Sequence, residues 1–263
     1  MKMNKTLLAL ALATATVSGS AMAWQSGDFN GSFDLGGVIN VPRVDNPWEV
    51  SAASAVTNFN YQLTTGESSF NITVPGNIPV LGIRTVRADF FNGGLGISPQ
   101  VSYNNSVDFA KASNGIGTLS LDVLDSSNSR KIGTMTVPFY AGAGYASANK
   151  ADGSNVLQGS LYAPNSGNAF FGGVPTATAK VDAQPWVTVA ALDPEYVANF
   201  QNQNASVGMF TNTKTSFNND GLKYTAFYGS GIKAGANVSI SLDKKLYADT
   251  NWKASLPITV SYM

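Results

Sequence analysis

The 263-residue sequence contains no cysteine and no histidine. Without cysteine the chain can form neither disulfides nor a thiolate metal site, and without histidine it lacks the base of the usual catalytic triads and the commonest zinc ligand. Stability must therefore come from a hydrophobic core, and a chain of this length can bury one. We expect no cofactor, no bound metal and no enzymatic activity.

A pair of carboxylates, Asp193 and Glu195, is the remaining catalytic option, because two such groups can hydrolyse a glycoside. They flank Pro194, however, and stand before an apolar run. Asp favours the helix cap, Pro the first helical position and Glu the positive end of the helix dipole. The pattern therefore predicts a short helix running to about Gln203.

Charge is also scarce, since only 12% of the residues are charged against about a quarter in typical globular domains. The 16 basic and 16 acidic side chains form no block of either sign. Nucleic acid therefore has no electrostatic reason to bind, and we expect no nucleic-acid partner. The surface must be covered by Asn, Ser, Thr and Gly, which suits a chain that stacks against copies of itself.

Long hydrophobic runs are absent except near the start of the chain. Lys2 and Lys5 precede an apolar run from Leu7 to Val17, which is followed by Ala21-Met22-Ala23. These are the three parts of a secretory signal, and the run is too short to span a bilayer. We expect residues 1–23 to be removed on export, leaving a mature chain that starts at Trp24.

Short apolar runs recur along the rest of the chain, separated by clusters of Gly, Asn, Ser and Pro. They are Phe70–Val74, Ile97–Tyr103, Thr118–Leu124, Met135–Tyr140, Val187–Ala191, Tyr224–Tyr228, Val238–Leu242 and Leu256–Tyr262. This spacing is typical of an antiparallel all-β sandwich or barrel. Between about residues 141 and 221 glycine and asparagine become frequent, which indicates an insertion with sandwich strands on both sides.

Both ends of the mature chain alternate with a period of two, which is the side-chain period of a β-strand. Within residues 24–41, one face carries Phe29, Gly31, Phe33, Leu35, Gly37, Ile39 and Val41, and the other is nearly all polar. Near the other end, one face carries Trp252, Ala254, Leu256, Ile258, Val260 and Tyr262. The N-terminal ribbon suits a groove in its own molecule or in a neighbour, or it is simply the first strand of its own sandwich.

Several motifs resemble the FaeG-type major fimbrial subunits and adhesins, a family of chaperone-usher pilins. Trp24 is followed by Gly27-Asp28-Phe29-Asn30-Gly31-Ser32, then by Asp34 and Gly36-Gly37. Further matches are Pro79-Val80-Leu81-Gly82, Phe171-Gly172-Gly173, and Trp252, Pro257 and Tyr262 near the end. The resemblance implies an incomplete immunoglobulin-like β-sandwich over residues 42–263, open along a groove and completed by a donor strand, with the insertion containing the short helix.

The resemblance also implies roles for the two ends of the chain. The alternate residues of the N-terminal ribbon would enter the groove of the next subunit, with Gly31 or Gly37 where the groove is shallow. The C-terminal strand would be recognised by a periplasmic chaperone, which the donor strand replaces at an outer-membrane usher. The expected partners are other copies of the chain and other fimbrial subunits, and the expected location is a fimbria, or pilus, on the cell surface.

Adhesion to host carbohydrate is a second implication of the resemblance, through the inserted region. Aromatic side chains there suit sugar rings, and the candidates are Tyr145, Tyr162, Phe170 and Trp186.

Two alternative functions stay open at this point. A minor or tip subunit of the same fimbria would share both ends of the chain. A small outer-membrane β-barrel would also be exported and antiparallel, although its strands need about ten residues and the runs here have five to seven.

Overall fold

The computed structural model describes residues 36–38, 45–202 and 212–263. The chain divides into two compact units, Met1–Pro42 and Arg43–Met263, and the strands and helices described below belong to the second. The predicted signal sequence and most of the predicted donor strand, including Phe29, Gly31, Phe33, Leu35, Ile39 and Val41, lie outside the described residues.

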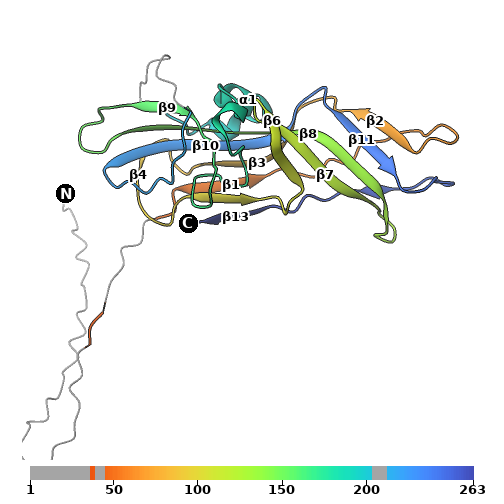
Figure 1. Ribbon diagram of the computed structural model, residues 1–263, viewed down its shortest axis with the longest axis horizontal. Helices are drawn as coiled ribbons and strands as arrows, with labels where there is room; N and C mark the ends of the chain where they lie inside the picture. Colours follow the sequence, from red (N-terminus) through yellow and green to blue (C-terminus); the bar gives the residue numbers. More distant parts are fainter. Residues whose placement is uncertain (1–35, 39–44, 203–211) are drawn as a thin grey trace, which may run out of the picture. The chain divides into compact units, whose positions relative to one another are not determined.

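Thirteen strands dominate the described part of the chain (Figure 1). They are β1 (Trp48–Ala52), β2 (Ser69–Thr73), β3 (Ile78–Thr85), β4 (Phe91–Asn92), β5 (Pro99–Ser102), β6 (Val107–Ser113), β7 (Ile116–Asp125), β8 (Lys131–Asn149), β9 (Leu157–Ser160), β10 (Leu222–Ile232), β11 (Asn237–Leu242), β12 (Trp252–Lys253) and β13 (Thr259–Tyr262). The helical segments are η1 (Thr178–Lys180), α1 (Pro185–Leu192) and η2 (Pro194–Val197).

The strands pair antiparallel, mainly in one large sheet with the path β1-β3-β10-β8-β11-β2. β8 spans 19 residues and connects two regions, because its first half pairs with β7 and β11 and its second half with β10 and β9. A separate two-stranded sheet joins β13 to β5. The architecture confirms the all-β, immunoglobulin-like sandwich predicted from the sequence.

The core follows from the alternation of apolar and polar residues along the strands. In β11, Val238, Ile240 and Leu242 are buried, whereas the residues between them are exposed. A cluster of buried aromatic rings packs at one end of the sheet, with Trp48 against Phe170 and Phe217. The indole N–H of Trp48 donates to the carbonyl of Ile97 at 2.6 Å, so the one polar atom of this ring is satisfied inside the core.

The helical segment differs from the prediction in two respects. The apolar run Val187–Ala191, predicted as a strand, lies in helix α1, which buries Val189 and Leu192 against Tyr196 and Phe227. Asp193 does cap the segment after it, accepting the N–H of Glu195, but that segment is the single 3-10 turn η2 and ends at Val197. A five-residue apolar run is too short for its periodicity to distinguish a buried strand from a helix.

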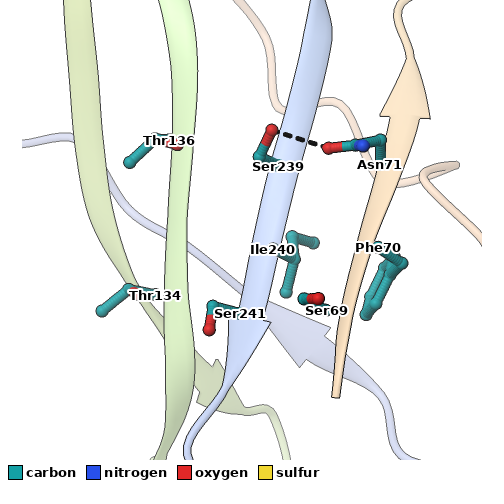
Figure 2. A pocket seen from close by; sticks show the side chains of 8 residues that line it. All are labelled: Ser69, Phe70, Asn71, Thr134, Thr136, Ser239, Ile240 and Ser241. Atoms are coloured by element: carbon teal, nitrogen blue, oxygen red, sulfur yellow. Dashed lines mark hydrogen bonds between the residues drawn. The ribbon is translucent and has the colours of Figure 1, made fainter. Parts of the chain in front are cut away.

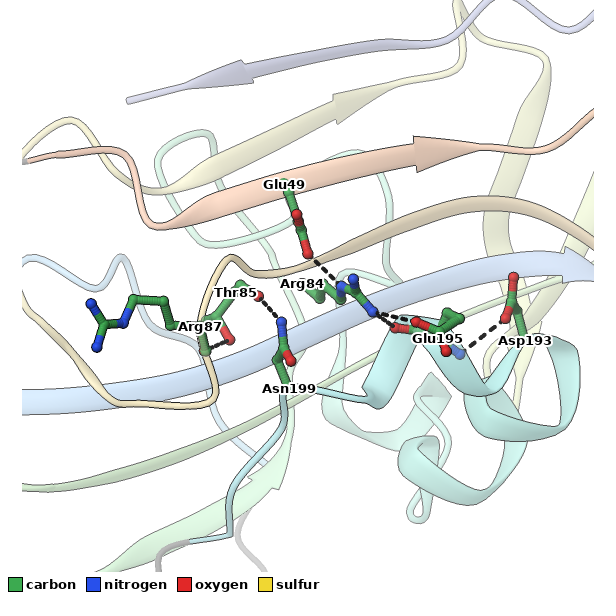
Figure 3. Close-up of polar contacts among 7 residues, drawn as sticks. All are labelled: Glu49, Arg84, Thr85, Arg87, Asp193, Glu195 and Asn199. Carbon is green, nitrogen blue, oxygen red and sulfur yellow. Dashed lines mark hydrogen bonds and ion pairs between the residues drawn. The ribbon is translucent and has the colours of Figure 1, made fainter.

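Arg84 attaches η2 to the edge of the large sheet (Figure 3). Its Nε donates to Oε1 of Glu49 in β1 at 2.6 Å, and its Nη1 donates to the carbonyl and Oε2 of Glu195 at 2.7 and 2.8 Å. Nearby, the amide of Asn199 donates to the carbonyl of Thr85. These contacts fix the helical segment on β1 and β3. β8 continues to Asn149, so residues 141–149 of the predicted insertion belong to this strand, and β10 begins at Leu222.

Within the described ranges, no helix is long and apolar enough to cross a membrane.

Candidate functional site

An open groove of about 700 Å³ runs between two segments that are far apart in the sequence. One wall is formed by residues 52–61, which follow β1, and the other by residues 250–258, which lead to β13. The floor between them is mainly apolar and is contributed by several strands. Its side chains are Ile78, Pro79, Val80, Leu119, Leu121, Met135 and Ile232.

The C-terminal wall has the alternation expected of a strand with one buried face. Trp252, Ala254, Leu256, Ile258, Val260 and Tyr262 are half-buried and pack against the core, whereas the residues between them are exposed. Its two ends are paired, because β12 bonds to β7 and β13 to β5. Residues 254–258 between them form no backbone hydrogen bond with another described segment.

The opposite wall is irregular. Its last ladder bond joins the N–H of Ala53 to the carbonyl of Val80. Beyond that point, a local bond between Asn60 and Asn58 is the only backbone hydrogen bond that residues 54–60 make with described residues. Among the described residues, both walls therefore carry backbone groups without a hydrogen-bond partner beside an apolar floor. Unpaired backbone groups along a sheet edge are a template for another strand, so the groove is suited to an added extended segment.

The two walls run in opposite directions. β1 begins at Trp48, which bonds to Ile97, and the C-terminal strand ends beside it, where Met263 exchanges backbone hydrogen bonds with Ser98. At the other end of the groove, Tyr61 stacks on Phe70 of β2, and β2 pairs with the end of β11, from which the chain leads to Thr250. We call these the Trp48 end and the Tyr61 end of the unit.

A polar cluster supports the Tyr61 end. The hydroxyl of Tyr61 donates to Oε1 of Glu67 at 3.0 Å, and the backbone N–H and hydroxyl of Thr64 donate to the other oxygen of Glu67. The hydrogen bond to the Glu67 carboxylate raises the pKa of Tyr61, and the N–H of Thr64 lowers the pKa of Glu67.

Lys253 is the only charged side chain among the described residues that line the groove. A segment that occupies the groove is thus expected to be apolar and uncharged along its buried face.

Comparison with known proteins identifies the family. The family model described as "Fimbrial, major and minor subunit" matches residues 3–263. The chain belongs to this family of fimbrial subunits. K88 fimbrial protein AD of Escherichia coli is 30% identical over 99% of this chain and 100% of its own length. K88 fimbrial protein AC and F41 fimbrial protein, both from Escherichia coli, are each 28% identical with the same coverage.

Membership of the fimbrial family establishes the coarse function. The chain is a structural subunit that assembles with other fimbrial subunits in a surface fimbria, and it is not an enzyme. The predicted catalytic alternative, Asp193 with Glu195, is accounted for by capping and by the ion pair with Arg84. No cluster of three potential metal-ligating side chains occurs in the described parts of this fimbrial subunit.

The four predicted glycan-binding residues differ in how far they are buried. Phe170 is fully buried among the core aromatics, and Tyr145 in β8 is only 4% exposed. This corrects the prediction at these two positions, because a ring enclosed by the core cannot stack on a sugar. Tyr162 and Trp186 are half-buried, and Trp186 lies in α1. Of the predicted donor residues, only Gly37 is described, and it is exposed.

A second hollow, of about 210 Å³, lies on the face of β8, β11 and β2 (Figure 2). Hydroxyl and amide side chains surround it, and the hydroxyl of Ser239 donates to Asn71 at 2.7 Å. It carries no charged side chain. Phe70 and Ile240 also line this hollow, which is smaller than the groove, so the groove remains the candidate site.

Sequence reasoning missed the wall formed by residues 52–61. The stretch from Ala52 to Thr57 consists of small residues and one valine, without a period of two. It becomes a wall only because β1, which precedes it, is held on β3. Of the floor residues, only Leu119, Leu121 and Met135 lay in runs predicted as strands. The runs did not include Ile78, Pro79, Val80 or Ile232, and no local pattern indicated which strand faces would stay uncovered.

Proposed function

We propose that the groove receives the N-terminal ribbon, residues 24–41, of another copy of this chain, so that the subunits polymerise by donor-strand exchange. The observation that carries the proposal is the apolar floor between two walls whose facing backbone groups are unpaired. The ribbon offers the complementary chemistry, since its apolar face alternates with polar residues and carries no charged side chain. Main-chain hydrogen bonds supply affinity, and the alternate side chains supply register.

The direction of the inserted strand decides which molecule provides it. The walls run in opposite directions, so an added strand is antiparallel to one and parallel to the other. Antiparallel pairing is slightly more stable per residue, and the C-terminal wall is the regular one. An antiparallel partner of this wall runs from the Trp48 end to the Tyr61 end, which places Phe29 towards the first and Val41 towards the second.

The chain's own ribbon cannot adopt this direction. Residues 42–47 join Val41 to Trp48 in seven Cα–Cα steps, which span at most about 25 Å when fully extended. The regular C-terminal wall, from Trp252 to Tyr262, involves ten residue steps, or about 33 Å of extended strand. The ribbon that fills the groove in the antiparallel sense therefore comes from another copy.

Before assembly, the groove requires another occupant, because its apolar floor faces water. We assign this role to a periplasmic chaperone strand that pairs with the C-terminal wall from Trp252 to Tyr262. Exchange for the donor strand then takes place at an outer-membrane usher during export to the surface. Gly31 would leave part of the floor lightly covered, so that exchange can proceed stepwise, and Gly37 is the other candidate for this role.

Adhesion to host carbohydrate is proposed as an additional activity of the assembled subunit. Tyr162 and Trp186 are the two candidate aromatics whose side chains are not enclosed by the core. We expect fibres of Trp186→Ala to bind fewer glycans on an array than wild-type fibres at equal protein, while fibre yield is unchanged. Unaltered binding by this variant and by Tyr162→Ala would remove both residues from a receptor site.

A thermal melt with a synthetic peptide tests the donor-strand proposal. The chain lacking residues 24–40 is melted alone, with a peptide of those residues, and with the same peptide carrying Phe33→Asp. We expect the unmodified peptide to raise the melting temperature in proportion to the logarithm of its concentration, and the altered peptide to do so much less. An acceptor that melts at the same temperature in all three samples would contradict the proposal.

Subunit stoichiometry in sheared fibres distinguishes a major subunit from a minor or tip subunit. The fimbrial family includes both kinds. A subunit that outnumbers every other in the fibre is the major one, and one present in a few copies per fibre is minor.

A further inference from the structure

Tyr247 is the most exposed large hydrophobic residue among those described, with 94% of its side chain open to solvent. It lies in the loop of residues 243–251, between β11 and β12. The neighbouring Leu246 is half-buried and packs against the core. The loop is tied down at both ends, because Asp243 donates its N–H to the carbonyl of Ile132 and Asn251 accepts the N–H of Ser126. The exposed ring therefore stands on an anchored loop.

This loop lies at the Tyr61 end of the unit, where the groove opens. Thr250, three residues after Tyr247, lines the groove. In Figure 1 the loop after β11 is at the right-hand end of the unit, opposite the C terminus and the start of β1. A single exposed aromatic is ordinary on a protein surface. Its position beside the mouth of the groove is what gives this one significance.

The Trp48 end of the unit carries exposed apolar side chains as well. Leu95 is 81% exposed and Val86 is 51% exposed. Both lie close to the start of β1, because the N–H of Val86 donates to the carbonyl of Pro47 and Trp48 bonds to Ile97, two residues after Leu95. The two ends of the unit thus present different apolar groups.

We propose that Tyr247 of one copy contacts the surface around Leu95 and Val86 of the next copy, as a second contact between successive subunits. The inference rests on the proposed donor strand, whose Val41 lies at the Tyr61 end of the acceptor. Residues 42–47 then join Val41 to Trp48 of the donor over at most about 25 Å. The Trp48 end of the donor must therefore lie close to the Tyr61 end of the acceptor.

The contact is head-to-tail, since two different surfaces of the same chain meet. Such a contact does not close on itself and generates a filament. A rigid aromatic ring that is buried on association is a typical anchor of protein interfaces. The contact would fix the angle between successive subunits, which a donor strand followed by a six-residue connection would otherwise leave free.

Charge contributes little to this contact. Lys244 and Lys245 in the loop are balanced by Asp243 and Asp249. At the other end, Arg87 pairs with Asp89 at 2.6 Å, and both side chains are exposed. Since the contact is mainly apolar, it persists at high salt, where interactions between exposed charges are screened.

Cross-linking in assembled fibres tests the contact, and the absence of native cysteine makes the test specific. Full-length chains with Tyr247→Cys and Leu95→Cys are assembled into fibres, treated with a short bifunctional maleimide and separated under denaturing conditions. A second pair, Tyr247→Cys with Val86→Cys, allows for a small offset of the ring. The matched control is Val187→Cys with Leu95→Cys, because Val187 is 55% exposed but lies on α1.

We expect a ladder of covalently linked subunits from at least one Tyr247 pair, at low and high salt, and none from the control pair. Loss of fibres in the Tyr247 variants alone, with an unchanged response of the groove to the donor peptide, also supports the contact. Intact fibres that yield no ladder from either pair overturn it. If the donor peptide still raises the melting temperature of the acceptor, only the Tyr247 contact is wrong and donor-strand exchange stands. If the peptide has no effect on the melting temperature, donor-strand exchange itself is overturned.

Discussion

At the scale of single residues, burial decides whether an aromatic side chain serves the core or a surface. Tyr145 lies in β8 opposite Ala226 of β10 and Gly159 of β9, so its ring is almost fully enclosed. The sequence showed only a tyrosine in a glycine-rich stretch. The strand that continues through this stretch, and the second neighbour on its other side, could not be inferred from local composition.

Burial raises the pKa of Tyr145 to about 12. The native state therefore holds this proton more tightly than the unfolded chain, whose tyrosines titrate near pH 10. The resulting stability is complete below about pH 10 and is lost as the pH rises towards 12. We expect the free energy of unfolding to fall more steeply for wild type than for Tyr145→Phe in this range, by up to about 2 kcal/mol. Urea denaturation at several pH values measures it, and parallel curves would contradict the assignment.

Gly82 in β3 is a second position where one additional atom, a Cβ, is expected to change the packing. A Cβ there would lie 2.2 Å from the ring of Tyr196, which belongs to η2. We expect Gly82→Ala to lower the free energy of unfolding by about 1–3 kcal/mol, because the ring has to move from its place on the sheet. Thermal denaturation measures the loss. Gly76→Ala is the matched control, since its Cβ meets no atom within 4 Å, and an equal loss in both variants would contradict the packing argument.

At the scale of elements, the sequence predicted most strands, but it predicted neither helix α1 nor the irregular wall of the groove. The alternation of apolar and polar residues in β11 and in the C-terminal wall could be recognised in the sequence, because half-buried strands have a period of two. The structure of the run Val187–Ala191 could not be predicted in this way, since the run is short and mostly apolar and its helical form depends on packing against β8 and β10. The groove was inferred through family resemblance, and its irregular wall at residues 52–61 carried no local signal.

Leu121 in β7 tests the floor of the groove. The residue is half-buried and faces the groove, so a carboxylate there can remain hydrated while the groove is empty. Insertion of a donor strand would bury that charge beside apolar side chains, which is costly. We expect Leu121→Asp to weaken binding of the donor peptide at least about tenfold, with little change in the melting temperature of the free acceptor. Titration calorimetry measures the affinity.

The control for the floor is Leu157→Asp, because Leu157 is 44% exposed in β9, outside the groove. This variant should bind the peptide as the unaltered acceptor does. If both aspartates weakened binding equally, the effect would be electrostatic or due to unfolding, and the floor assignment would fail.

At the scale of the whole molecule, the fold is an antiparallel sandwich with an open apolar groove, which we propose is completed by a strand of another copy. Low charge, absent cysteine and polar uncharged surfaces agree with a subunit whose stability is completed by its neighbours. In the proposed donor-strand exchange, assembly and stabilisation become the same event, because the strand that links two subunits also covers the groove. The direction of the two walls, which only the structure reveals, supports a strand from another copy.

Hydrogen exchange of the acceptor, with and without the donor peptide, locates the added strand most directly. The acceptor lacks residues 24–40, and exchange is followed along the backbone. We predict that amides in residues 254–258 exchange more slowly when the peptide is bound, because they gain ladder hydrogen bonds, while loop 243–249 is unchanged by the peptide alone. Exchange at residues 254–258 that is equally fast with saturating peptide would contradict the central claim that the groove is completed by a strand from another subunit.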